Sequence, residues 1–222
     1  MLDLIKIDIK KFGLKKLPLY FLIANIPLAL IAFAILYMTN SALIESAPEV
    51  IDILVKPVFI IWEAILISRI IIDEFKNKTM LMLYTYPINK KKLIISKVLI
   101  ATGYSLSGIW GSQIILNILF YVLSRFMPQI PYLLSLNQVI AYLVSSLMVI
   151  LLGLIPLSAG LVQYSTVATM VTSLMIVIMG SSSGLGFDQL LNRLSVVSIM
   201  GVIGIISAVY SISRTLKRDL LV

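Results

Sequence analysis

Residues 17–39 read LPLYFLIANIPLALIAFAILYMT, a run that contains no Asp, Glu, Lys or Arg. An α-helix needs about 20 mostly apolar residues to cross the roughly 30 Å hydrocarbon core of a bilayer, so this run is long enough. The apolar part of a cleaved signal peptide is only ~7–15 residues long. Further long apolar runs follow in the chain. Residues 17–39 therefore predict a transmembrane helix that stays in the membrane.

The whole chain has the composition of a membrane protein. Of its 222 residues, 60% are hydrophobic and 13% are charged, and the mean hydropathy is +1.06. Soluble domains are nearer to a quarter charged. A water-soluble fold of this length could not bury so much apolar surface, so part of it must face lipid. We expect an all-α fold with a single transmembrane domain over residues 1–222.

Six segments are long and apolar enough to be spanning helices. The stretch from Gln138 to Gly180 is too long for one crossing, and Pro156 and Gly160 predict the place where two helices join in a tight hairpin. The predicted spans are 17–39, about 53–72, about 98–123, two helices within 138–180, and about 194–213.

The basic residues predict the orientation of these spans. The N-terminal segment, the loop after the second span and the C-terminal tail together carry 14 of the 18 Lys and Arg residues. The first loop on the other side is acidic, with Glu45, Glu49 and Asp52. Because cytoplasmic loops carry an excess of Lys and Arg, both termini are expected in the cytoplasm. The net charge of +8 lies at the ends of apolar runs, which is a sign of topology and argues against nucleic-acid binding.

Residues 1–16 have an amphipathic pattern. Leu2, Ile5, Ile9 and Phe12 would share one face of a helix, with lysines on the other, which is typical of a helix in the headgroup region. The alternation over residues 5–10 also suits a strand. A lone strand at a membrane surface would leave its edges unpaired, which favours the helix.

The chain lacks the residues of an enzyme. It has no His and no Cys, which excludes imidazole and thiol chemistry and the metal sites that they build. Residues 180–184 read GSSSG and match the Gly-x-Ser-x-Gly pattern of a nucleophilic serine, but no histidine exists to activate it. No Gly-Lys-Ser/Thr follows the glycines, so the segment is not a phosphate-binding loop. We predict no catalytic residue, no metal site and no cofactor in this chain.

Glu63 is the acidic residue nearest the middle of the second predicted span. A charge at mid-bilayer costs roughly 2.5–3.5 kcal/mol on insertion scales, so the carboxyl group should face protein or water. A polar residue of another span could satisfy it, and the candidates are Asn25, Gln113 and Asn117. Glu63 either lines a translocation path or a subunit interface, or it forms a structural hydrogen bond between helices.

The fifth predicted span has one polar face. Gln163, Thr166, Thr169 or Met170, and Ser173 recur at helical spacing. Such a face fits hydrogen bonding between helices, and it equally fits the wall of a translocation path or a dimer interface.

The segment 180–193 that follows is too polar to span and too apolar for a plain loop. It predicts a re-entrant element on the outer side, with these residues at its centre: Gly184, Gly186, Asp188 and Arg193.

Two patterns predict helix packing alone. Gly103, Ser107 and Gly111 place a small residue at every fourth position of the third span, and Gly201 and Gly204 do so less regularly in the sixth, which should let other helices approach closely.

The four-residue spacing of Arg69 and Asp73 predicts a local ion pair at the cytoplasmic end of the second span.

The cytoplasmic segment 73–97 reads DEFKNKTMLMLYTYPINKKKLIISK: a short amphipathic element, a proline turn and a basic start to the third span. It resembles the corresponding loop of ABC-2 type transporter permeases. That family has an acidic residue, a Gly-Thr pair, a leucine-rich helix, Thr-x-Pro, a basic cluster and a final lysine. The matching positions here are Glu74, Thr79, Leu81, Leu83, Thr85, Pro87, Lys90 and Lys97, while Lys78 stands where the family has glycine.

The resemblance implies the transmembrane subunit of an ATP-driven exporter in a bacterial cell membrane. Two permeases, identical or homologous, would dock on two copies of a cytoplasmic ABC ATPase, which binds the ATP and Mg²⁺. Small Gram-positive permeases that export amphipathic toxic peptides, such as phenol-soluble modulins, are the most similar. The residues that this resemblance assigns to contact with the ATPase are Glu74, Thr79, Leu83, Tyr84, Tyr86, Pro87, Lys90 and Lys91.

Two alternatives stay open on the sequence. An ion-gradient-driven transporter would use Glu63 as its coupling site, although pumps of that kind usually have several buried carboxylates or histidines. A membrane-embedded immunity or scaffold protein would bind a toxin and transport nothing.

Overall fold

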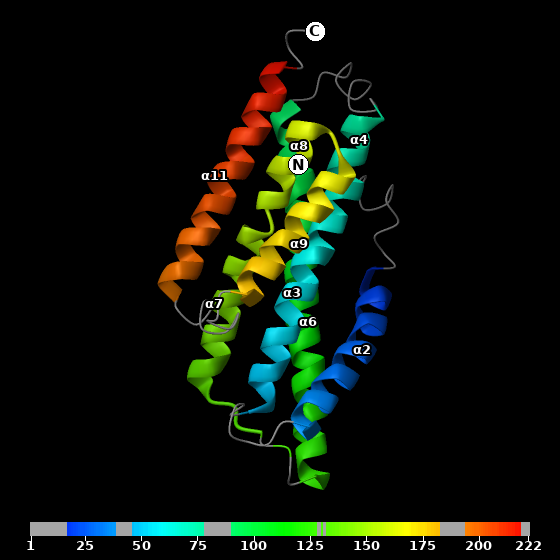
Figure 1. Cartoon of the computed structure of the whole chain (residues 1–222), viewed down its shortest axis with the longest axis vertical. Helices are drawn as coiled ribbons and strands as arrows, with labels where there is room; N and C mark the ends of the chain where they lie inside the picture. The colour runs from blue at the N-terminus through cyan, green and yellow to red at the C-terminus, as the bar shows by residue number, and fades with distance from the viewer. Residues whose placement is uncertain are drawn as a thin grey trace.

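The computed structural model describes residues 17–38, 46–77, 90–127, 130, 132–182 and 194–218 of the chain. All regular structure within these ranges is helical, and the helices form one elongated bundle (Figure 1). The predicted all-α fold is therefore confirmed for the described part. The predicted interfacial helix 1–16 lies outside it. The helices are α2 (Leu17–Met38), α3 (Ala47–Ile67), the π-helix η2 (Ser68–Ile72), α4 (Asp73–Lys76), α6 (Lys90–Phe126), α7 (Leu136–Leu152), α8 (Ile155–Gln163), α9 (Thr166–Ser182) and α11 (Leu194–Arg218).

Within the described residues, four stretches of helix are long and apolar enough to cross a membrane: Leu19–Met38, Lys91–Phe126, Leu136–Gln163 and Ser198–Thr215. Their surfaces carry exposed apolar side chains such as Leu30, Ile118 and Ile206, as lipid-facing helices do. The expected second span falls on α3, which contains charged residues, and the expected fifth falls on the shorter α9. Six crossings therefore stay a prediction.

Helix α3 is the centre of the bundle and packs against α2, α6, α7 and α9 (Figure 1). Its side chains Val55, Phe59 and Ile60 are buried. The ring of Phe21 on α2 lies 5.7 Å from that of Phe59, and Gly108 on α6 allows this close approach, because a Cβ there would overlap the Phe59 ring.

The predicted small-residue stripe of the third span does not pack closely against any helix in the described part of the chain. Gly103 and Ser107 are exposed, and a Cβ on Gly103 or Gly111 would meet open space. The glycine that permits close packing is Gly108, which follows Ser107 directly and therefore lies about 100° around the helix from the predicted face. The spacing rule identified the right helix and the wrong face, because the stripe alone does not say where the neighbouring helices lie.

The predicted packing face of the last span is confirmed. Gly201 and Gly204 of α11 are buried against α7, and a Cβ on Gly204 would overlap the carbonyl oxygen of Leu151. Ala208 is buried further along the same helix.

Gly204→Ala should therefore destabilise the fold by roughly 1–3 kcal/mol, because a backbone atom cannot move aside as a flexible side chain can. Gly103→Ala is the matched control and should cost nothing, because its Cβ would meet open space. Thermal unfolding of the two purified variants in detergent measures the difference. Equal midpoints would contradict the packing of α11 on α7.

The predicted hairpin near Pro156 and Gly160 is wrong in position. The chain only bends at Gly153 and Leu154, continues through α8, and reverses at Tyr164, whose φ of 48° is left-handed. Pro156 lies in the first turn of α8, where a missing N–H costs nothing. Gly160 lies inside α8 and does not end it. A side chain at this position would overlap Thr169 and Ile72, which pack directly against the glycine.

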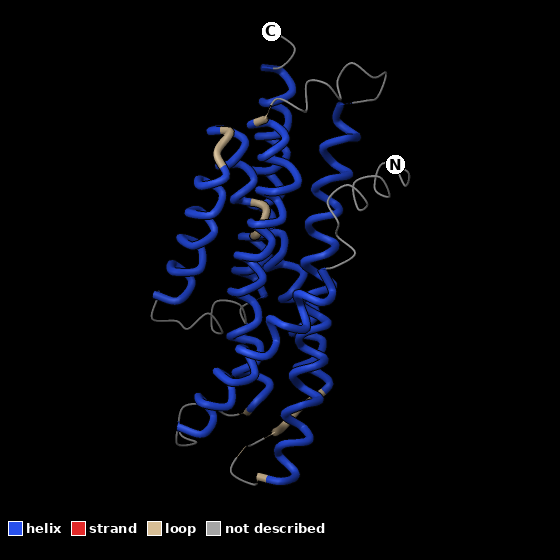
Figure 2. Tube along the Cα trace, turned by 90° about the vertical axis from the view of Figure 1, so that its right-hand side faces the viewer, coloured by secondary structure: helices blue, strands red, loops and turns tan. Residues whose placement is uncertain are grey.

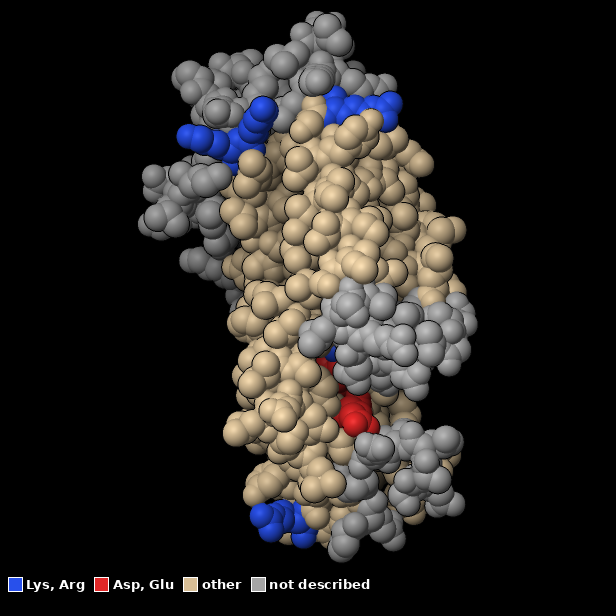
Figure 3. Space-filling view, turned by 90° about the vertical axis from the view of Figure 1, so that its left-hand side faces the viewer, with Lys and Arg blue, Asp and Glu red and all other residues tan. Residues whose placement is uncertain are grey.

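One end of the bundle carries a group of exposed basic side chains. The end of α4, the start of α6, the α8–α9 turn and the end of α11 lie together at one end (Figures 1 and 2). This end carries the exposed side chains of Lys76, Lys91, Lys92 and Arg214. Between the ends most of the visible surface is uncharged (Figure 3). The sequence predicts that this end faces the cytoplasm, and that orientation stays a prediction.

Candidate functional site

Three sets of buried charged residues lie along α3 and its continuation into η2 and α4. Asp52 and Lys56 form the first set, Glu63 the second, and Glu74 with Lys97 the third. Burial of charge inside a bundle of apolar helices is costly unless the charge is paired, so such groups mark the positions with most to contribute to function.

Asp52 and Lys56 form a buried ion pair one turn apart on α3. The second oxygen of Asp52, Oδ1, accepts a hydrogen bond of 2.8 Å from Nε2 of Gln113 on α6. The Lys56 ammonium lies 5.8 Å from the ring centroid of Tyr142 on α7, close enough for a cation–π interaction. Three helices are thus joined by one polar cluster.

This cluster corrects the sequence prediction for Asp52, which was placed in an outer acidic loop before the second span. Helix α3 begins at Ala47, so both residues are inside the helix, and both are buried. Mutual neutralisation and the Gln113 amide make this burial possible.

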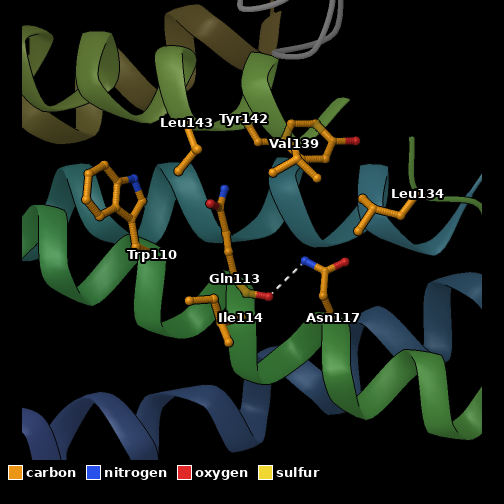
Figure 4. A pocket seen from close by; sticks show the side chains of 8 residues that line it. All are labelled: Trp110, Gln113, Ile114, Asn117, Leu134, Val139, Tyr142 and Leu143. Carbon is orange, nitrogen blue, oxygen red and sulfur yellow. Dashed lines mark hydrogen bonds between the residues drawn. The ribbon is translucent and has the colours of Figure 1, made fainter. Parts of the chain in front are cut away.

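A cavity of about 230 Å³ lies between α6 and α7 beside this cluster (Figure 4). Its walls are mostly apolar, and it is open on the surface that would face lipid, where Ile114 and Leu143 are exposed. Gln113 forms its polar base. The lining residues are Trp110, Gln113, Ile114, Asn117, Leu134, Val139, Tyr142 and Leu143.

Hydrogen bonds fix the polar residues around the cavity. Asn117 donates from Nδ2 to the carbonyl oxygen of Gln113 at 2.8 Å, and Trp110 donates from Nε1 to Oγ of Ser146 at 2.8 Å. Tyr132 donates to Oδ1 of Asn117 at 3.4 Å. Partial burial, and to a smaller degree Tyr121, raise the pKa of Tyr132.

Glu63 is fully buried, and neither carboxyl oxygen has a hydrogen-bond partner among the described residues. Its carboxyl group lies over Gly153, in the break between α7 and α8. The predicted partners are wrong: Asn25 donates to the carbonyl of its own α2 residue Phe21, while Gln113 and Asn117 belong to the cluster around Asp52.

The third set joins α4 to the start of α6, the two helical segments that flank residues 78–89 and are called the loop stems below. Lys97 near the start of α6 is fully buried, and its Nζ lies 3.1 Å from Oε2 of Glu74 on α4. Most residues that the resemblance assigns to ATPase contact lie outside the described part: Thr79, Leu83, Tyr84, Tyr86 and Pro87. The side chain of Lys90 is also outside it, whereas Lys91 is exposed in the first turn of α6.

The α8–α9 hairpin packs on the same end of α3. The Tyr164 ring in the turn lies 5.9 Å from the Phe75 ring on α4. Thr169 and Ser173 are buried on α9, and Thr169 contacts Gly160. Movement of α4 would therefore reach this hairpin directly.

The predicted polar face of the fifth span is corrected by this hairpin. Gln163 is the last residue of α8, on the other side of the turn, and is exposed. Thr166 is half-buried, Ser173 is buried, and Met170 is exposed. Thr169, the alternative to Met170, is the residue on the buried face.

The predicted ion pair between Arg69 and Asp73 does not form. Arg69 is exposed and lies in the π-helix η2, while Asp73 begins α4. The wider π turn moves residues four apart off the shared face that they would have on an α-helix. The predicted re-entrant residues Gly184, Gly186, Asp188 and Arg193 lie outside the described part.

Sequence reasoning missed two features that had a signal. The four-residue spacing of Asp52 and Lys56 is that of an intrahelical pair. Gly153, three residues before Pro156 in an apolar run, is a helix-break signal. No local pattern could have paired Gln113 with Asp52 or placed Glu63 over Gly153, because these contacts join distant segments.

Comparison with known proteins found one close relationship in sequence. No family model matches the chain, and no solved structure matches it. The chain is 31% identical over 198 residues to the Bacillus subtilis (strain 168) protein named "Uncharacterized protein YcbO", a match that covers 84% of this chain and 86% of the relative. The similarity thus extends over most of both chains, including most of the helical bundle. The chain belongs to the same protein family as Bacillus subtilis YcbO.

Proposed function

We propose that this chain is the transmembrane permease subunit of an ATP-driven ABC exporter that moves amphipathic peptides or related hydrophobic toxins out of a bacterial cell. The observation that carries the proposal is the buried contact between Glu74 and Lys97. It fixes the two stems of the very loop whose sequence resembles the ATPase-coupling loop of ABC-2 permeases.

A loop that receives force from a partner needs rigid stems, and the structure offers a direct mechanical connection. Helix α4 continues through η2 into α3, so displacement of the loop would move the helix that carries Asp52, Lys56 and Glu63. The contact between Phe75 and Tyr164 would carry the same displacement to the α8–α9 hairpin. A packed core transmits strain because it has few voids to absorb it.

The energy would come from outside the chain, which has no nucleotide-binding loop. In this proposal two copies of an ABC ATPase bind ATP and Mg²⁺ below two permease subunits. Six spans cross the cell membrane with both termini in the cytoplasm, residues 180–193 form the outer re-entrant segment, and the exposed Lys91 contributes to the ATPase contact. Glu63, Thr166, Ser173, Gln163 and Met170 belong to the path or to the interface between subunits.

Replacing residues 84–92 by a Gly/Ser linker of equal length tests the proposal. The chain should co-purify with an ABC ATPase of its own genome when the two are co-expressed, and the linker variant should lose this association because the docking surface is gone. Helical content measured by circular dichroism is the control for folding, since the only replaced residues within a described helix are 90–92 in the first turn of α6, where Lys91 and Lys92 are exposed. Unchanged co-purification of the linker variant would contradict the proposed coupling surface.

An ion-gradient-driven transporter is the second candidate, and the burial of Glu63 without a hydrogen-bond partner favours it. A coupling carboxylate must bind and release its ion during each cycle. This candidate predicts uptake into sealed vesicles without ATP, abolished in Glu63→Gln.

A further inference from the structure

We propose that Glu63 is a proton-binding residue of the folded bundle, whose neutral carboxylic acid donates a hydrogen bond to a backbone carbonyl released at the break between α7 and α8. This state would attach the broken helix to α3. It does not depend on what drives transport.

The break removes the usual donor from one carbonyl group. In a continuous α-helix the N–H of Leu154 would bond to the carbonyl oxygen of Ile150, four residues earlier. Here it bonds instead to Leu151 at 3.3 Å, and the N–H of Gly153 bonds to Val149 at 2.9 Å. The carbonyl oxygen of Ile150 is thus left without its helical donor, inside a bundle where water is scarce.

The Glu63 carboxyl group lies beside this released carbonyl. A Cβ built on Gly153 would overlap Oε2 of Glu63 and would lie 3.1 Å from the oxygen of Ile150. Only a glycine leaves this space for the carboxyl group. An ionised carboxylate and a carbonyl are both acceptors, so their contact would be unfavourable, whereas the neutral acid has one O–H to donate.

Among the described residues, no cation is placed to stabilise the ionised form. Helices α8 and α9 have no charged or titratable side chain, and on α7 only Tyr142 is titratable. Lys56 is paired with Asp52, Lys97 contacts Glu74, and Arg69 is exposed. The remaining titratable side chains described on α2 and α6 form no hydrogen bond with Glu63: Tyr20, Tyr37, Lys91, Lys92, Tyr104, Tyr121 and Arg125. Nor does any described group of three acidic residues offer a metal site.

Infrared spectroscopy of the full chain in lipid nanodiscs tests the protonation directly. The wild type should show the C=O band of a buried carboxylic acid, and Glu63→Gln should lose it. Glu49→Gln, the same change in the half-buried first turn of α3, is the matched control and should retain it. Gly153→Ala, which pushes the carboxyl group away from the carbonyl, should shift the band to higher frequency because the hydrogen bond weakens.

Thermal unfolding tests whether position 63 needs a hydrogen-bond donor or only a side chain of similar size. Glu63→Gln keeps a donor and should unfold near the wild-type midpoint, whereas Glu63→Leu should unfold several degrees lower. Exchange of sodium for choline should change neither the band nor the midpoint. The proposal is overturned if the acid band is absent, if Asp52→Asn removes it instead, or if Gly153→Ala leaves it unshifted. A midpoint that rises with sodium would assign a metal cation to the site in place of the proton.

Discussion

Lys56→Met should destabilise the folded protein by roughly 3–5 kcal/mol, because it leaves a buried carboxylate without its counter-charge. Asp52 would retain only the amide of Gln113 as a partner. Methionine fills about the same volume as the lysine stem, so lost packing does not explain the effect. Thermal unfolding of the purified variant in detergent, together with the yield of monodisperse protein, measures it.

The double variant Asp52→Asn/Lys56→Met is the decisive control for this prediction. It removes both charges and leaves an amide that still meets Gln113, so it should recover most of the lost stability. Lys92→Met, an exposed lysine at the start of α6, should change stability by no more than about 0.5 kcal/mol. If Lys56→Met were as stable as Lys92→Met, the pair would not be buried as the structure has it.

Glu74→Lys should separate the two stems of the loop 78–89 and abolish association with the ATPase. Two ammonium groups would then face each other in a buried position, which should cost at least the roughly 3–5 kcal/mol of a broken buried pair. Local opening should expose the loop stems, so limited trypsin digestion should cut there faster, while co-purification of the ATPase falls.

The charge swap Glu74→Lys/Lys97→Glu should restore both readouts, because it rebuilds the attraction with the charges exchanged. Restoration measured against either single variant distinguishes the interaction from the individual side chains. Retained ATPase association in Glu74→Lys would show that the contact does not support the docking surface.

The sequence predicts those parts of the fold that depend on long apolar runs. Residues 17–39 become α2, and the sixth predicted span becomes α11 with its glycine face packed on α7. These features depend on local composition and on small residues at helical spacing. Membership of the YcbO family was not predictable from these patterns and comes from the sequence comparison.

The errors occur where tertiary contacts outweigh local pattern. Asp52 was predicted to lie in a loop, but it is inside α3, where Gln113 of α6 donates to it. Pro156 was predicted to mark a hairpin, but it lies in the first turn of α8. Arg69 and Asp73 have α-helical spacing, which the π-helix η2 removes. Glu63 was expected to face protein or water, and it is buried, but its location over Gly153 depends on two segments 90 residues apart in the sequence.

Reconstitution of the purified chain into sealed vesicles, with and without its ATPase, tests the central claim most directly. A fluorescent amphipathic peptide should accumulate against its gradient only when the ATPase, ATP and Mg²⁺ are all present, and a hydrolysis-deficient ATPase should abolish the accumulation. Uphill movement of the peptide by the chain alone, without nucleotide, would contradict the account.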